Sequence, residues 1–146
     1  MGKFEKDTGA GRFFKDFKKY HGLPVQDAIF FNQSDLICDM AKHEDFIVMG
    51  RCADVVLTNH HIPHIFITAS FDQRVRRMME INSLNYKQAE HLLKKLDKRH
   101  ERYYHAYTGK KWGDAVNYDL CIDSASYGIE ESVELIERMI NKYPNS

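Results

Sequence analysis

An α/β fold with a parallel sheet is the architecture that this sequence predicts, and two features support it. Short apolar runs at 46–49, 65–69 and 118–123 are typical of strands that are buried within a parallel sheet. Stretches of helical, amphipathic period lie before, between and after these runs. No repeat or linker interrupts the chain, so we expect residues 1–146 to form a single domain.

The composition excludes several classes of protein. Apolar residues make up 43% of the chain and charged residues 29%, which favours a soluble globular domain over a disordered one. No apolar run approaches the ~20 residues of a membrane-spanning helix. The cysteines Cys38, Cys52 and Cys121 are far apart in the sequence and form no Cys-x-x-Cys pair. We therefore expect free thiols and a cytoplasmic location.

The net charge is zero, but the charges are unevenly distributed along the chain. Residues 64–111 carry eleven Lys and Arg against five Asp and Glu, whereas residues 112–146 carry two against seven. This pattern suggests that the middle of the chain faces an anion, although solvated helix faces would produce the same pattern. Nucleic-acid binding is a weaker alternative because the sequence contains no recognised nucleic-acid-binding module.

The N-terminal part of the chain is predicted to be mainly helical. We expect residues 1–12 to be flexible, 13–20 to form a short amphipathic helix rich in Phe, and 25–43 to form a longer one. A short helical piece is expected at 53–57. The loop at 59–64 contains three histidines, but its proline and the lack of other ligands at suitable spacing favour a polar turn over a metal site.

Local capping signals mark the later helices. Ser70 and Gln73 form a capping-box pattern that predicts a helix start, and Asn85 with Gln88 predicts the start of another helix. We expect this second helix to reach about residue 107. A closing amphipathic helix is predicted over 129–143, with an apolar face and four glutamates outside.

The first apolar run leads directly into Gly50 and Arg51. An arginine after a buried strand would stand at the carboxyl edge of the sheet, where open α/β folds bind ligands. Its guanidinium could hold a phosphate or carboxylate in two parallel hydrogen bonds. The alternative is an arginine that pairs with a carboxylate of a nearby helix. The position alone does not separate these two interpretations.

Several motifs, taken together in order and spacing, give a family resemblance over about residues 25–140. They are Phe31-Asn32-Gln33-Ser34, Val48-Met49-Gly50-Arg51-Cys52-Ala53-Asp54, Ile67-Thr68-Ala69-Ser70-Phe71-Asp72-Gln73-Arg74-Val75-Arg76-Arg77-Met78, Asp97-Lys98-Arg99 with Tyr103-Tyr104, and the stretch from Tyr107 to Leu120. With these motifs the chain resembles the cytidylate kinase-like family of P-loop nucleoside monophosphate kinases.

The resemblance implies transfer of the γ-phosphoryl group of ATP, assisted by Mg²⁺, to CMP or dCMP. It implies that Arg51 grips the acceptor phosphate and that residues 94–114 form a lid-like region. We expect about residues 97–114 of this region to be mobile without ligand. The other candidates implied are the substrate-binding residues Asp54, Gln33 and Tyr103, the catalytic lid cations Lys98, Arg99 and Arg102, and the donor-nucleotide residues Arg74 and Arg77. Arg74 and Arg77 could equally be structural ion-pair partners.

The sequence departs from the family pattern at its start. No G-x-x-x-x-G-K-[ST] loop is present, and the glycines at 9 and 11 follow no predicted strand. The predicted fold is therefore a three-layer P-loop kinase-like sheet that lacks its first strand and phosphate loop. We expect negligible phosphoryl transfer by this chain alone. The alternative function is a non-catalytic oligomerising or nucleotide-binding domain that is derived from the kinase fold.

The missing strand also predicts an assembly. In the family it lies between the strands expected here at 46–49 and 64–68, so both would present unpaired backbone groups. The two strands could pair directly, residues 1–12 could fill the gap, or a second copy could supply the missing element. Of these outcomes we expect a homodimer or a higher oligomer.

Overall fold

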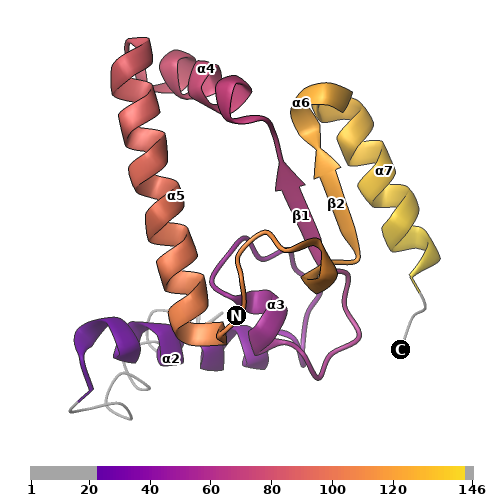
Figure 1. The fold of residues 1–146 in the computed structure, drawn as a ribbon. Helices are drawn as coiled ribbons and strands as arrows, with labels where there is room; N and C mark the ends of the chain where they lie inside the picture. The colour runs from indigo at the N-terminus through magenta and orange to yellow at the C-terminus, as the bar shows by residue number, and fades with distance from the viewer. Residues whose placement is uncertain (1–22, 144–146) are drawn as a thin grey trace, which may run out of the picture. The chain divides into compact units, whose positions relative to one another are not determined.

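The computed structural model describes residues 23–143, so the expectations for 1–12 and for the Phe-rich helix at 13–20 lie outside the described residues. The structure divides into two compact units, residues 1–58 and 59–146, which are described separately below (Figure 1). The elements are α2 (Val25–Met40), α3 (Ala53–Val56), β1 (Ile65–Thr68), α4 (Phe71–Asn82), α5 (Tyr86–Thr108), the 3-10 helix η2 (Ala115–Asn117), β2 (Leu120–Asp123), α6 (Ser124–Tyr127) and α7 (Ile129–Lys142).

In the first unit, the one-turn helix α3 packs against α2. The helix α2 begins after Pro24, whose fixed φ suits a helix start, and it ends at Met40, three residues earlier than predicted. Ile37 and Leu57 are buried in this unit. The Cys38 thiol lies 3.8 Å from the carbonyl oxygen of Val56, which links the two helices.

The predicted strand at 46–49 is wrong. Residues 44–49 form neither a helix nor a strand, and they are not part of any sheet among the described residues. Ile47 and Met49 are 92% and 87% exposed. An unbroken apolar run becomes a buried strand only where neighbours pair with it and cover both faces, and the run itself does not specify those neighbours.

The sheet of the second unit consists of β1 and β2, which pair in parallel with Ile65 opposite Leu120 and Thr68 opposite Asp123. The two strands predicted at 65–69 and 118–123 and their parallel direction are therefore confirmed, although the first ends one residue earlier and the second begins two residues later than predicted. With helices on the same chain, the structure is mixed α/β. The two strands pair with each other directly, and Ile122 of β2 is buried.

The helices α4 and α5 form a hairpin around a small hydrophobic core. Val75, Ala89 and Leu93 are the buried residues of this core. Both predicted capping boxes are present, one at Ser70 and one at Asn85. Each box satisfies backbone N–H groups that the first helical turn leaves unpaired, so local sequence sets both helix starts.

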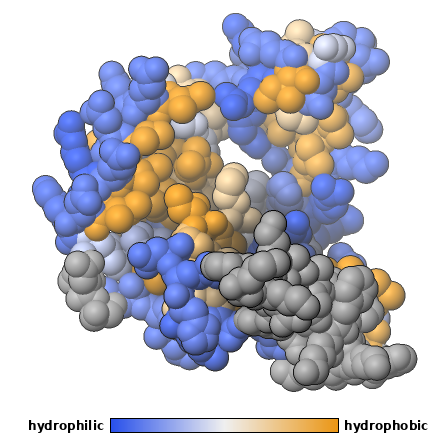
Figure 2. Space-filling model, turned by 180° about the vertical axis from the view of Figure 1, so that it is seen from behind, coloured by the Kyte–Doolittle hydropathy of each residue, from blue (hydrophilic) through white to orange (hydrophobic). Residues whose placement is uncertain are grey.

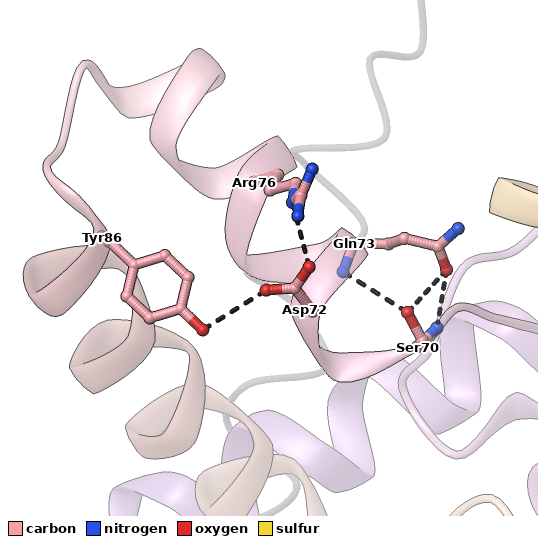
Figure 3. A network of polar contacts seen from close by, with 5 residues as sticks. All are labelled: Ser70, Asp72, Gln73, Arg76 and Tyr86. Carbon is pink, nitrogen blue, oxygen red and sulfur yellow. Dashed lines mark hydrogen bonds and ion pairs between the residues drawn. The ribbon is translucent and has the colours of Figure 1, made fainter.

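A polar network holds the first turn of α4 next to the start of α5 (Figure 3). Asp72 accepts a hydrogen bond from Arg76 Nε at 2.9 Å and another from the Tyr86 hydroxyl at 3.3 Å. Desolvation, and then the charge of Asp72, raise the pKa of Tyr86. At neutral pH this tyrosine is therefore a stable donor to the Asp72 carboxylate.

Aromatic contacts connect the loop after α5 to the sheet. The Phe66 ring of β1 packs 5.8 Å from the Trp112 ring and 4.9 Å from the Tyr118 ring, measured between centroids. Gly113 has φ +72°, and a Cβ atom at this position would lie 3.0 Å from Phe66 Cζ. The close approach and the left-handed backbone both favour glycine here.

The end of α7 closes onto the segment that enters β1. The Tyr143 hydroxyl lies 3.0 Å from the carbonyl oxygen of Ile62, to which it donates, and the His61 ring packs 4.8 Å from the Tyr143 ring. Asp119 Oδ2 accepts a 2.7 Å hydrogen bond from the backbone N–H of His64. Two histidines of the predicted polar loop thus have structural contacts. Among the helices of residues 23–143, none is long and apolar enough to cross a membrane.

Candidate functional site

A groove of about 370 Å³ opens at the carboxyl ends of β1 and β2. Ala69 follows β1 and Ser124 follows β2, and both line the groove. The wall formed by α4 is polar and contributes Gln73, Arg74 and Arg77. The carboxyl edge of a parallel sheet is the usual ligand-binding position in open α/β folds. This groove is therefore the candidate site of the second unit.

The opposite wall of the groove is apolar and comes from α7. Ile129, Val133 and Ile136 recur at helical spacing along it, and Ile67 of β1 joins them. Ile129 and Ile67 are 62% and 58% exposed. Figure 2 shows hydrophobic side chains gathered on this side of the molecule, over the region of the strands and α7. The groove thus places apolar side chains opposite cationic ones.

Arg74 is held by a carboxylate of α5. Its two terminal guanidinium nitrogens donate to the two carboxylate oxygens of Asp97 at 2.8 and 2.9 Å. Its guanidinium carbon also lies 5.7 Å from the centre of the Phe71 ring. A bidentate pair of this kind fixes both side chains. Of the two roles predicted for Arg74, the structure thus supports the ion-pair role.

Arg77 lies one helical turn further along α4 and is exposed. Within the part of the chain that the structure describes, it makes no ion pair. Its neighbour Arg76, in contrast, is paired with Asp72. Arg77 is therefore a cation on the groove wall that remains available to an anionic ligand.

The predicted lid cations Lys98, Arg99 and Arg102 are exposed on α5. Among the described residues, none of these three forms an ion pair. Tyr103 is half-buried, and its ring packs 4.8 Å from the Tyr107 ring. The helix α5 continues to Thr108, so the predicted lid region consists of its last turns and the following loop. The predicted mobility of this region remains a prediction.

In the first unit, the predicted phosphate clamp lies in an unusual backbone turn. Gly50, Arg51 and Cys52 have φ angles of 69°, 60° and 54°, so three consecutive residues are left-handed. For a residue with a side chain this conformation costs about 1–2 kcal/mol. Strained backbone of this kind gathers at functional sites. Arg51 is exposed, and it forms no ion pair with any residue in 23–143.

The turn places the other candidates of this unit around α3 and α2. Cys52 precedes α3 and is buried, and its burial together with the nearby charge of Asp54 raises its pKa to about 11. At neutral pH this cysteine is a thiol, so it would not act as a nucleophile. Gln33 of α2 has a buried Oε1 atom without a hydrogen-bond partner. That oxygen is an acceptor that a ligand or water could satisfy.

Asp123 ends β2 at the groove, but its carboxylate is already engaged. It accepts a 2.8 Å hydrogen bond from the Ser126 hydroxyl and two of 3.1 Å from the backbone N–H groups of Ala125 and Ser126. These bonds, the one from the Ser126 hydroxyl first, lower the pKa of Asp123. The carboxylate therefore serves to cap α6.

Sequence reasoning missed two features of the site. One is Asp97, which the motif contained but to which no role was given. The other is the apolar wall of α7, which was predicted simply as the inward face of a closing helix. No group of three or more His, Cys, Asp or Glu residues among the described residues could hold a metal ion.

The comparisons with known proteins agree with the motifs. The model of the cytidylate kinase-like family matches residues 1–126. The chain belongs to this family. It is also similar to a solved structure, an uncharacterized protein from Eubacterium ventriosum ATCC 27560, with 29% identity and a TM-score of 0.71. The match covers 92% of this chain and 76% of that one. A search of curated proteins gave no match.

Proposed function

We propose that this member of the cytidylate kinase-like family binds nucleotides, with CMP or dCMP as the acceptor and ATP as the donor. The observation that carries the proposal is the groove at the carboxyl ends of β1 and β2, which presents Arg77 opposite an apolar wall. Family membership supports nucleotide binding and phosphotransferase chemistry in general. The particular nucleotides are part of the proposal.

The two walls of the groove suit the two parts of a nucleotide. Ile129 and Val133 offer an apolar surface to the faces of a base, while Arg77 can stack on a base or pair with a phosphate. Because Asp97 neutralises Arg74, Arg77 is the residue that we expect to contact the donor. A ligand that is flat, apolar on its faces and anionic at one end fits this arrangement.

Arg51 has the properties of an acceptor-phosphate clamp. Its side chain is exposed, and its backbone lies in the left-handed turn that precedes α3. The planar guanidinium of an arginine, held in a fixed position, recognises phosphate better than the flexible ammonium group of a lysine. The exposed α5 cations Lys98, Arg99 and Arg102 offer further positive charge to the phosphates of a bound nucleotide.

The described residues contain no preformed cluster of metal ligands. Mg²⁺ is usually held by one or two carboxylates or hydroxyls together with substrate phosphates. The described residues offer no group of three or more His, Cys, Asp or Glu residues that could hold a metal ion, and the sequence has no G-x-x-x-x-G-K-[ST] loop. We therefore assign to these residues nucleotide binding and no metal-dependent step. A coupled assay with ATP, Mg²⁺ and CMP should show negligible turnover, and turnover near ~1 s⁻¹ would contradict this assignment.

Calorimetric titration with CMP and with ATP tests the proposed binding. Arg77→Ala should weaken ATP binding about 10- to 100-fold, the loss of one charge-assisted contact. Its control is Arg76→Ala, which removes the neighbouring, Asp72-paired arginine. Arg51→Ala should weaken CMP binding to a similar degree, with the exposed Arg138 of α7 as the control position. Unchanged affinities in Arg77→Ala and Arg51→Ala would refute the proposal.

A second candidate function is a non-catalytic oligomerising domain. The segment at 44–49 favours it, because Ile47 and Met49 expose apolar side chains there that another chain could cover. The titrations above separate the two candidates, since an oligomerising domain without a nucleotide site would bind neither CMP nor ATP.

A further inference from the structure

Gln73 stands on the polar wall of the groove, four positions before Arg77. It is the third residue of α4, and its side chain takes part in the capping box at Ser70. Its amide oxygen Oε1 accepts hydrogen bonds from the backbone N–H of Ser70 at 3.3 Å and from the Ser70 hydroxyl at 2.6 Å. The capping box thus occupies the oxygen of this side chain.

The same contacts determine the orientation of the Gln73 amide. A backbone N–H group donates only to an acceptor, so the amide oxygen must be the atom that faces Ser70. The amide nitrogen Nε2 therefore lies on the side turned away from Ser70, as Figure 3 shows. Within residues 23–143, this nitrogen has no hydrogen-bond partner. Gln73 therefore keeps two unused N–H donors on a side chain that lines the groove.

The α4 side chains that line the groove offer donors and no unused acceptors. Arg77 carries guanidinium N–H groups only, and it makes no ion pair within the described residues. Arg74 Nε is a buried donor without a hydrogen-bond partner. The oxygen of Gln73 is already engaged, so this residue adds donors as well. Such a wall complements ionised phosphate oxygens, which only accept hydrogen bonds, and it offers no acceptor to the amino group of a base.

Gln73 and Arg77 are close enough to contact one polyphosphate group. Residues four positions apart on a helix share a face, and their Cβ atoms lie ~5–6 Å from each other. The guanidinium supplies positive charge, and the amide supplies donors whose position the capping box holds. On the opposite wall, the apolar side chains of α7 present no charge to a phosphate.

We propose that Gln73 and Arg77 together bind the phosphates of a nucleotide, and that the base lies against the apolar wall of α7. This inference rests on the proposed function, to which it adds a binding residue and the direction in which the ligand lies. The ligand class that it implies is a polyphosphate attached to a flat, apolar-faced body. A nucleoside without phosphates would leave the donors of α4 unsatisfied.

Calorimetric titration with ATP tests the role of Gln73. Gln73→Met removes the amide donors without adding charge, and it should weaken ATP binding about 10-fold. Gln73→Glu also places a carboxylate one turn from Arg77, so it should weaken ATP binding about 100-fold. Gln88 is the matched control, because it holds the same position in the capping box of α5 and does not line the groove. Gln88→Met and Gln88→Glu should bind ATP as the wild type does.

Thermal unfolding separates a binding role of Gln73 from a purely structural one. Glutamate also serves at this position of a capping box, and it pairs favourably with an arginine four positions later on a helix. Gln73→Glu should therefore unfold at the same temperature as the wild type or slightly above it. A variant that is at least as stable as the wild type but binds ATP more weakly cannot have lost binding through unfolding.

Inorganic tripolyphosphate, which has no base, tests the direction of the ligand. In competition with a fluorescent ATP analogue, its affinity should fall in Gln73→Met by the same factor as that of ATP. An unchanged tripolyphosphate affinity beside a weakened ATP affinity would overturn the proposed direction, because the amide would then contact the base. Unchanged ATP binding in Gln73→Met, or an equal loss in Gln88→Met, would overturn this inference alone. A wild type that binds no nucleotide would overturn the proposed function as well.

Discussion

Replacing Arg74 should destabilise the second unit much more than it affects nucleotide binding. Its guanidinium makes two charge-assisted hydrogen bonds to Asp97, and the two side chains are 33% and 23% exposed. One such bond contributes about 1.5–3 kcal/mol, and partial exposure reduces the sum of two. We expect Arg74→Ala to lower the free energy of unfolding by about 2–3 kcal/mol, which includes leaving Asp97 without its partner.

Urea unfolding followed by tryptophan fluorescence can measure this loss, because Trp112, the one tryptophan of the chain, belongs to the same unit. Arg74→Lys keeps the positive charge but cannot make the two parallel hydrogen bonds, so it should lower the free energy of unfolding by about half as much as Arg74→Ala. A double-mutant cycle with Asp97→Ala should give a coupling energy of at least ~1 kcal/mol. An unchanged unfolding midpoint in Arg74→Ala together with a clear fall in ATP affinity would refute this reasoning. Arg74 would then be a ligand-binding residue.

Two further predictions concern backbone and thiol chemistry. Gly113→Ala should lower the free energy of unfolding, measured by thermal unfolding, by about 1–2 kcal/mol more than Gly109→Ala. Both positions have positive φ, but only at Gly113 would the new Cβ atom press against the Phe66 ring. Equal losses of stability in the two variants would show that the ring moves aside. Cys52, with its pKa raised to about 11, should react with a thiol reagent at pH 8 far more slowly than the exposed Cys121. Comparable rates by mass spectrometry would contradict the burial of Cys52.

The sequence predicts those parts of the fold that local chemistry determines. Both capping boxes begin helices where the Ser70 and Asn85 patterns place them, because the same few residues supply the donors and acceptors. The strands at 65–68 and 120–123 were also predictable, since each has an apolar run and the two pair with each other. The run at 46–49 has the same local pattern but no neighbouring strand in the described structure.

The candidate site shows the same limit. Arg74 and Arg77 share a predicted helix face, and the sequence offered both of them the same two roles. Asp97 of α5, 23 positions away in the sequence, pairs with Arg74 and not with Arg77. This contact gives the ion-pair role to Arg74 and leaves the ligand-binding role to Arg77. The left-handed conformation of Arg51 and Cys52 was not predictable either, since neither residue favours positive φ.

The contact made by Tyr143 has a consequence for how this chain can be handled. Its hydroxyl reaches back 81 positions to the carbonyl of Ile62, at the entrance to β1. Trimming by a carboxypeptidase that passed this tyrosine would therefore loosen a strand far from the cut. A purification tag or fluorescent fusion placed directly after Lys142 would have the same effect, whereas one joined beyond Tyr143 through a flexible spacer would leave the closure intact.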